Sequence, residues 1–188
     1  ALAAASGLSI ADPVCRRIDP LATDPGMTPL LDFPDAANRD LRHIACIDPG
    51  AGEPDRLLVF LPGTTGLPED YEEIASFAAR LGYAVVSLAH PNIPALRELL
   101  EPGVDPEESE RIRRERLYGE PLSDLVEVSE TDSIENRLVK LLEWLQREHP
   151  GEGWGAFLDE GGGPLWERIV VAGHSQGAGH AAYLTRDQ

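Results

Sequence analysis

Residues 168–177 read RIVVAGHSQG, the stretch of the chain that says most about its fold. The run from 168 to 172 predicts a buried strand, and the small residues after Gly177 favour a helix. Strand, tight turn and helix in direct succession are the setting of a G-x-S-x-G motif that exposes its serine. Gly173 and Gly177 lack Cβ atoms where strand and helix crowd each other, so the Ser175 hydroxyl is expected at the C-terminal edge of the sheet. The alternative is a glycine-rich turn whose serine only caps the helix.

Strands and helices also alternate on the N-terminal side of this motif. Apolar runs predict three further strands, at 41–47, 57–61 and 84–89. Apolar spacing and end signals predict helices over about 68–82, 107–118 and 132–149. The first of these helices is expected to bury one apolar face, made of Ile74, Phe77, Ala78 and Leu81. The alternation predicts the α/β class, as a three-layer sandwich with a mostly parallel sheet and helices on both faces.

The length of 188 residues corresponds to a single domain. Residues 1–38 are rich in Ala, Pro and Asp without a sustained period, and are expected to form an extended N-terminal arm. The domain then covers 39–188, with an insertion at 91–131 that is rich in charge, Pro and Gly. Because this insertion leaves the sheet at its C-terminal edge, it is expected to form a wall or partial lid over a pocket there.

The charge of the chain excludes one class of partner. The sequence has 16 Lys and Arg residues against 33 Asp and Glu residues, which gives a formal net charge of −17 at pH 7. Such an acidic surface repels phosphate backbones, so no nucleic-acid partner is expected. No apolar run approaches the roughly 20 residues of a membrane-spanning helix, so no membrane span is expected either.

Two features of the sequence bear on the compartment. The chain opens with ALAAAS, small residues typical of the region around a signal-peptidase site. This favours a secreted or periplasmic protein, with a cytoplasmic one as the alternative. Cys15 and Cys46 could close a disulfide loop of about 30 residues, or they could be two unrelated thiols.

Two motifs resemble those of the α/β-hydrolase superfamily, specifically of its serine esterases, lipases and thioesterases. The first along the chain is LPGTTG at 61–66, directly after the predicted strand 57–61, and the second is the G-x-S-x-G turn. The resemblance covers roughly 41–188. Pro62 stands where many members of the superfamily have histidine. The alternative for this loop is an ordinary connection that needs glycine for its dihedral angles.

The resemblance implies a set of site residues. Ser175 would be the nucleophile, and the backbone N–H groups of Thr64 and Gln176 would hold the oxyanion that forms when it attacks a carbonyl group. It also implies that an acid and then a histidine follow the serine in the chain, because a serine hydroxyl attacks only when a base removes its proton. His180 and Asp187 lie on the helix that carries the motif, where neither is suitably placed. The catalytic acid and histidine, with the later strands of the domain, are therefore expected on sequence beyond residue 188.

The other histidines are expected to have lesser roles. His174 lies inside the turn, where such a residue packs or hydrogen-bonds beneath it, and His180 is expected at the surface or between helices. His90 ends a strand at the edge where sites form in α/β sheets, so it could line the pocket. His43 and His149 have no chemically suggestive neighbours in the sequence.

No cofactor is expected. No pair of histidines with a carboxylate has the spacing of a metal site, and no Cys-x-x-C is present. The glycines at 161–163 are expected to form a flexible loop, since no helix start with Lys and Ser or Thr follows them as in a phosphate cradle.

The sequence thus predicts a serine hydrolase that cleaves a small-molecule carboxylic ester or thioester through an acyl-enzyme on Ser175. The rest of the hydrolase domain is expected as its partner. A peptidase or a carbon–carbon hydrolase stays open within the enzyme class. Outside that class, the alternative is a noncatalytic member of the fold that serves as a binding or scaffold module.

Overall fold

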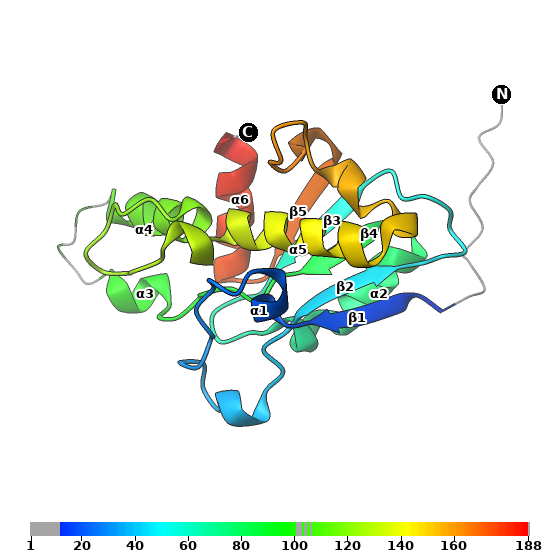
Figure 1. Cartoon of the computed structure of the whole chain (residues 1–188). Helices are drawn as coiled ribbons and strands as arrows, with labels where there is room; N and C mark the ends of the chain where they lie inside the picture. Colours follow the sequence, from blue (N-terminus) through cyan, green and yellow to red (C-terminus); the bar gives the residue numbers. More distant parts are fainter. Residues whose placement is uncertain (1–11, 101–102, 104, 106, 188) are drawn as a thin grey trace.

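The computed structural model describes residues 12–100, 103, 105 and 107–187, and five strands in these ranges form one sheet (Figure 1). Across the sheet the strands follow the order β1-β2-β4-β3-β5. Their bounds are β1 Val14–Ile18, β2 His43–Ile47, β3 Leu57–Leu61, β4 Ala84–Ser87 and β5 Ile169–Gly173. The helices are α1 Pro20–Thr23, α2 Glu72–Arg80, α3 Leu96–Leu99, α4 Glu108–Tyr118, α5 Ile134–Glu148 and α6 Gln176–Asp187. Short 3₁₀ turns are η1 Ala36–Asn38, η2 Pro68–Tyr71, η3 Glu130–Asp132, η4 Pro150–Glu152, η5 Trp154–Phe157 and η6 Trp166–Arg168.

The sheet is mixed, so the expected mostly parallel sandwich is wrong. Strand β2 pairs antiparallel with β1 and with β4, whereas β3 pairs in parallel with β4 and with β5. The reversal of β2 has a local cause. The link from β2 to β3, at 48–56, contains no helix and begins with a turn in which the Ala51 N–H donates to the Asp48 carbonyl. Parallel strands need a crossover of a dozen or more residues, and this link is too short to form one.

Strand β1 lies in the arm 1–38, where the sequence predicts no regular element. It pairs with β2 along its whole length, and Cys15 lies opposite Cys46. The two sulfur atoms form a disulfide, with the two Cα atoms 4.1 Å apart. Of the two alternatives that the sequence left open, the disulfide is therefore the one in the structure. It joins the arm covalently to the sheet.

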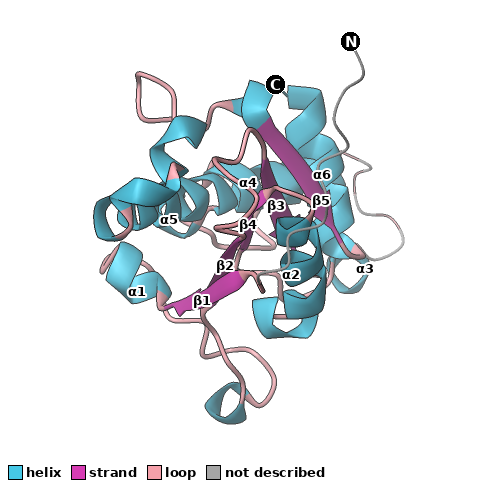
Figure 2. Ribbon diagram, turned by 90° about the vertical axis from the view of Figure 1, so that its right-hand side faces the viewer, coloured by secondary structure: helices cyan, strands magenta, loops and turns pink. Residues whose placement is uncertain are grey.

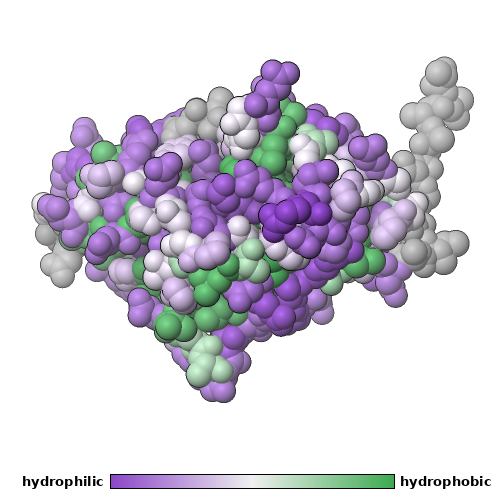
Figure 3. Space-filling view, viewed as in Figure 1, coloured by the Kyte–Doolittle hydropathy of each residue, from purple (hydrophilic) through white to green (hydrophobic). Residues whose placement is uncertain are grey.

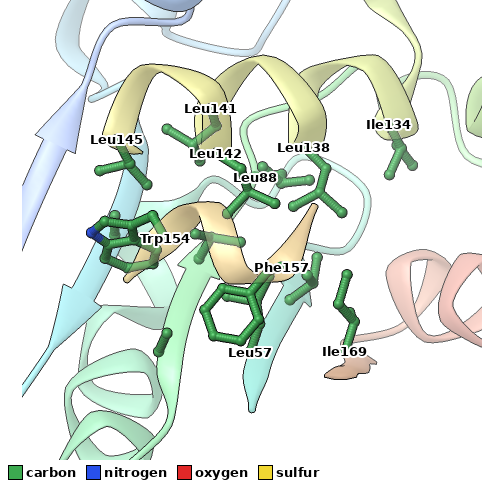
Figure 4. Packing of buried hydrophobic residues seen from close by; sticks show 14 of the residues in the cluster. Leu57, Leu88, Ile134, Leu138, Leu141, Leu142, Leu145, Trp154, Phe157 and Ile169 are labelled. Atoms are coloured by element: carbon green, nitrogen blue, oxygen red, sulfur yellow. The ribbon is translucent and has the colours of Figure 1, made fainter. Parts of the chain in front are cut away.

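The main core lies between the sheet, α5 and η5 (Figure 4). Its strand residues occupy alternate positions, as expected for one face of a pleated sheet. The core includes Leu57, Val59, Leu61, Val86 and Leu88 from the strands and their ends, Leu138, Leu141, Leu142 and Leu145 from α5, and Trp154 and Phe157 from η5. Each such leucine contributes about 1.5–3 kcal/mol when it is fully buried. This cluster therefore positions the strands whose ends carry the candidate site.

Helix α2 covers the opposite face of the sheet (Figure 2). It packs over β2 and β4 through alanines, which contact a small apolar cluster. These residues are Ala75, Ala78 and Ala79 of α2 and Ile44, Cys46 and Val85 of the sheet. The predicted apolar face is wrong in three of its four members, because Ile74, Phe77 and Leu81 are 47%, 58% and 55% exposed. Small side chains let the helix lie close to the sheet, and larger ones would hold it away.

The remaining predicted elements are confirmed with small shifts of their bounds. The four predicted strands are β2 to β5, and the predicted helices are η2 with α2, α4, α5 and α6. The face of the molecule in Figure 3 is mostly hydrophilic, in keeping with the net charge of −17. In the described ranges, no helix is both long and apolar enough to cross a membrane.

Replacing Ala79 with Leu should destabilise the protein by about 1–3 kcal/mol, because the added atoms overpack a fully buried contact. Replacing Phe77 with Ala should change the free energy of unfolding by less than about 0.5 kcal/mol, since this side chain is mostly exposed. Urea unfolding followed by tryptophan fluorescence measures both changes. A larger loss for Phe77→Ala than for Ala79→Leu would show that α2 packs through its predicted face instead.

Candidate active site

The turn between β5 and α6 holds Ser175 in a left-handed backbone conformation. Its φ angle is 52°, in a region that costs residues other than glycine about 1–3 kcal/mol. A Cβ atom on Gly173 would lie 2.5 Å from the carbonyl carbon of Gly177, and a Cβ atom on Gly177 would lie 2.1 Å from the Leu61 oxygen. As the sequence predicts, the two glycines let α6 begin directly at the ends of β3 and β5. Ser175 is exposed at this edge of the sheet.

The loop after β3, at 62–66, lies against this turn. The His174 N–H donates to the Leu61 carbonyl oxygen at 3.1 Å. A Cβ atom on Gly63 would lie 3.1 Å from the Ser175 Cβ and 2.9 Å from the His174 oxygen. Only glycine therefore fits at position 63 without moving the turn, and the two loops of the predicted site are in contact.

Several main-chain N–H groups on these loops have no acceptor in the described part of the chain, and two of them are at predicted site residues. They belong to Thr64 in the loop after β3 and to Gln176 at the first position of α6. Both are the groups that the resemblance assigns to an oxyanion. The N-terminus of a helix carries partial positive charge, so the Gln176 N–H is suited to an anionic oxygen.

Asn92 fixes the conformation of the loop after β3. Thr65 has a φ angle of 59°, which is rare for a β-branched residue. The Asn92 Nδ2 donates to the carbonyl oxygens of Gly63 at 2.6 Å and Gly66 at 3.2 Å, and its Oδ1 accepts the Thr65 N–H at 3.2 Å. Asn92 is 1% exposed. These three bonds satisfy the backbone groups of the strained loop and so hold Thr64 in place between them.

The side chain of Gln176 anchors the segment that carries Asn92. Its Nε2 donates to the Asn92 carbonyl oxygen at 2.7 Å, and its Oε1 accepts the Leu96 N–H at 2.8 Å. Gln176 also follows Ser175 directly in the chain. One buried polar network therefore connects the turn of Ser175 to the loop of Thr64, and such networks favour a single conformation when every group is paired.

His174 is bonded to Tyr71. Its Nδ1 lies 3.0 Å from the Tyr71 hydroxyl, and Tyr71 in turn packs on Phe60, with 4.8 Å between ring centroids. His174 forms this hydrogen bond as expected of a residue in the turn, but its side chain is exposed. Tyr71 is 103 positions away in the chain, so the sequence carries no signal for this pair.

The three histidines at 43, 90 and 180 lie in the interior. They are 1% exposed or less, and the rings of His90 and His180 meet edge to face with centroids 6.2 Å apart. Burial lowers the pKa of His90 to about 4 and lowers the pKa of His43 and of His180 well below the usual value. All three are therefore neutral at pH 7. The sequence allowed His180 a place at the surface or between helices. The structure excludes the surface, because His180 is buried.

None of the five histidines hydrogen-bonds to Ser175 within the described residues. A general base has to reach the hydroxyl oxygen at about 3 Å. His174 is bonded to Tyr71, three histidines are buried, and His149 ends α5 beside Trp144. The described site thus consists of the serine, two N–H donors and the network that positions them.

No metal site accompanies this arrangement among the described residues, since no group of three or more His, Cys, Asp and Glu side chains could hold an ion. None of the family models, curated proteins and solved structures with which the chain was compared matches it.

Replacing Asn92 with Ala should lower the free energy of unfolding by about 1–3 kcal/mol, because Gly63, Gly66 and Thr65 lose their buried partner. Asn38→Ala is the matched control, since Asn38 makes an exposed bond to Asp35 and should cost less than about 0.5 kcal/mol. Urea titration of both variants measures the difference. Equal small losses would show that the loop keeps its shape without Asn92.

Proposed function

We propose that the protein is a serine hydrolase that cleaves a carboxylic ester or thioester through an acyl-enzyme on Ser175. The observation that carries the proposal is the pairing of an exposed, strained serine with a neighbouring loop that is strained at Thr65. Backbone strain of this kind persists only where the surrounding structure enforces it, and it clusters at functional sites. Only these two loops support the resemblance to the α/β-hydrolase superfamily. The sheet does not support it, because the sheet is mixed.

In the proposed reaction, the Ser175 Oγ attacks the carbonyl carbon of the substrate and transfers its proton to a base. The carbonyl oxygen becomes an oxyanion and accepts the N–H groups of Thr64 and Gln176. Collapse of this intermediate breaks the bond to the alcohol or thiol, which leaves with the proton from the base. Water then attacks the acyl-enzyme in the same way and gives its proton to the base. The second intermediate collapses to the carboxylic acid and free Ser175. A preorganised donor of this kind contributes about 3 kcal/mol to transition-state stabilisation.

The base in this proposal is not one of the five histidines of the chain. His174 is bonded to Tyr71, three histidines are buried without a hydrogen bond to Ser175, and His149 lies at the end of α5. We assign the base, and the acid that orients it, to a segment other than residues 1–188. That segment is the remainder of the hydrolase domain, and it is the partner that the proposal requires.

The compartment is part of the proposal as well. The Cys15–Cys46 disulfide supports a secreted or periplasmic protein, because disulfides persist in oxidising compartments. The substrate is a small ester or acyl compound. A noncatalytic scaffold would not need a strained, exposed serine, and this favours the enzyme.

A fluorophosphonate probe should label Ser175 in the full-length protein, because among the described serines only Ser175 combines exposure with the elbow conformation. Peptide mass spectrometry locates the label. Ser175→Ala should abolish labelling, whereas Ser76→Ala on α2 should leave it unchanged. Labelling of another residue would contradict the assignment, and a folded protein without any label would favour the noncatalytic alternative.

Replacing Thr64 with Pro should lower kcat by about 10² to 10³ because it removes a main-chain N–H from the oxyanion. Thr64→Ala keeps that N–H and should change kcat by less than about threefold. Hydrolysis of a p-nitrophenyl ester by the full-length protein measures both, with circular dichroism as a check on folding. Equal losses in the two variants would show that the Thr64 hydroxyl group matters and its amide does not.

A further inference from the structure

Helix α4 of the insertion carries a half-buried cation without a carboxylate partner. Of the 16 Lys and Arg residues in the chain, twelve form an ion pair among the described residues. The others are Arg56 and Arg97, which are exposed, Arg116, which is buried, and Arg113, which is half-buried. Withdrawing a charge from water is costly unless an opposite charge lies beside it. The position of Arg113 therefore has a cost that no ion pair among the described residues offsets.

The Arg113 guanidinium lies against the first turn of α6, the helix that begins directly after Ser175. Its Nη1 donates to the Gln176 carbonyl oxygen at 3.5 Å. Its Cζ lies 5.4 Å from the centroid of the Tyr183 ring. A Cβ atom on Gly179 would lie 2.3 Å from Nη1, so the guanidinium occupies the space that this glycine leaves. A positive charge is thus held beside the residue whose N–H is assigned to the oxyanion.

Arg116, about one turn further along α4, adds to the positive charge at this place. It is 1% exposed, and the adjacent Glu115 offsets part of its charge. The field of the two arginines reaches α6. At His180 of that helix, burial lowers the pKa most, and the neighbouring His90 and then the two arginines lower it further. The interior beside the first turns of α6 is therefore positive, although the net charge of the chain is −17.

We propose that Arg113 stabilises the oxyanion of the Ser175 reaction through its positive charge, which acts across Gln176. This inference rests on the proposed function, since it concerns the same oxyanion. The negative charge on the carbonyl oxygen appears only when the serine attacks, so the cation stabilises the transition state more than the bound substrate. A unit charge about 10 Å from an anion changes a rate by roughly tenfold at an effective dielectric constant of about 20. A helix of the insertion thus acts on the reaction by its charge.

Hydrolysis of a p-nitrophenyl ester by the full-length protein measures this effect. Arg113→Gln should lower kcat about tenfold and change KM by less than about twofold. Arg113→Lys keeps the charge and should lower kcat by less than about threefold. Arg114→Gln is the matched control, because it removes the same charge from an ion pair with Glu120 and should leave kcat within about twofold. Equal kcat values for Arg113→Gln and Arg114→Gln would overturn the inference.

A double-mutant cycle separates the charge from damage to α6. Gly179→Leu fills the space of the guanidinium and so displaces the charge without removing it. By itself it should lower kcat at least about threefold, whereas in the Arg113→Gln background it should change kcat by less than about twofold. An equal loss in both backgrounds would show that the leucine distorts the helix, and this would overturn the inference.

Binding of phenylboronic acid tests the same charge without turnover. The Ser175 Oγ adds to boron and gives its proton to the base, which leaves a tetrahedral anion in the place of the oxyanion. Arg113→Gln should weaken this binding about tenfold, and Arg114→Gln should not weaken it. Equal affinities of the two variants would overturn the inference but leave the proposed function standing. A folded full-length protein that neither hydrolyses esters nor binds the boronic acid would overturn both.

Discussion

The close approach of α6 to the end of β3 is the constraint on which the candidate site depends. Gly177 meets the Leu61 oxygen at a distance that leaves no room for a Cβ atom, and Gly173 meets the backbone of α6 in the same way. Because backbone lies against backbone here, the turn between the two glycines cannot change its conformation without moving α6 or the end of β3. Ser175 is consequently held in its left-handed conformation and exposed, and the loop after β3 is kept in contact with it.

A second layer of the structure maintains the loop opposite Ser175. Asn92 bonds backbone groups of Gly63, Thr65 and Gly66. The Gln176 side chain donates to the Asn92 carbonyl oxygen and accepts the Leu96 N–H. Without the hydrogen bonds of Asn92, the strained conformation of Thr65 would cost about 1–3 kcal/mol that no local interaction offsets. Each loop thus depends on the other for its shape, and both depend on the core that α5 and η5 build against the sheet. This connection explains how two N–H groups from distant parts of the chain come to lie at one edge.

Local patterns predicted the elements well and their mutual arrangement poorly. The apolar runs located β2 to β5, and the apolar spacing over 132–149 located α5. The same runs say nothing about strand direction, so the antiparallel pairing of β2 with β4 could not be read from them. For α2 the largest apolar side chains were expected inward, but close packing on the sheet selected the alanines. Larger apolar side chains are more hydrophobic, so a pattern of hydrophobicity places them in the core. A helix that lies close to a sheet has room only for small side chains.

By itself, the sequence determined the motif around Ser175, the need for glycine on both sides of it and the existence of most strands and helices. Those features depend on neighbours within a few residues, which a pattern can register. The tertiary structure alone decided the place of β1, the Cys15–Cys46 bond and the role of Asn92. These features join segments far apart in the chain, and their partners become neighbours only when the sheet and the helices have packed together.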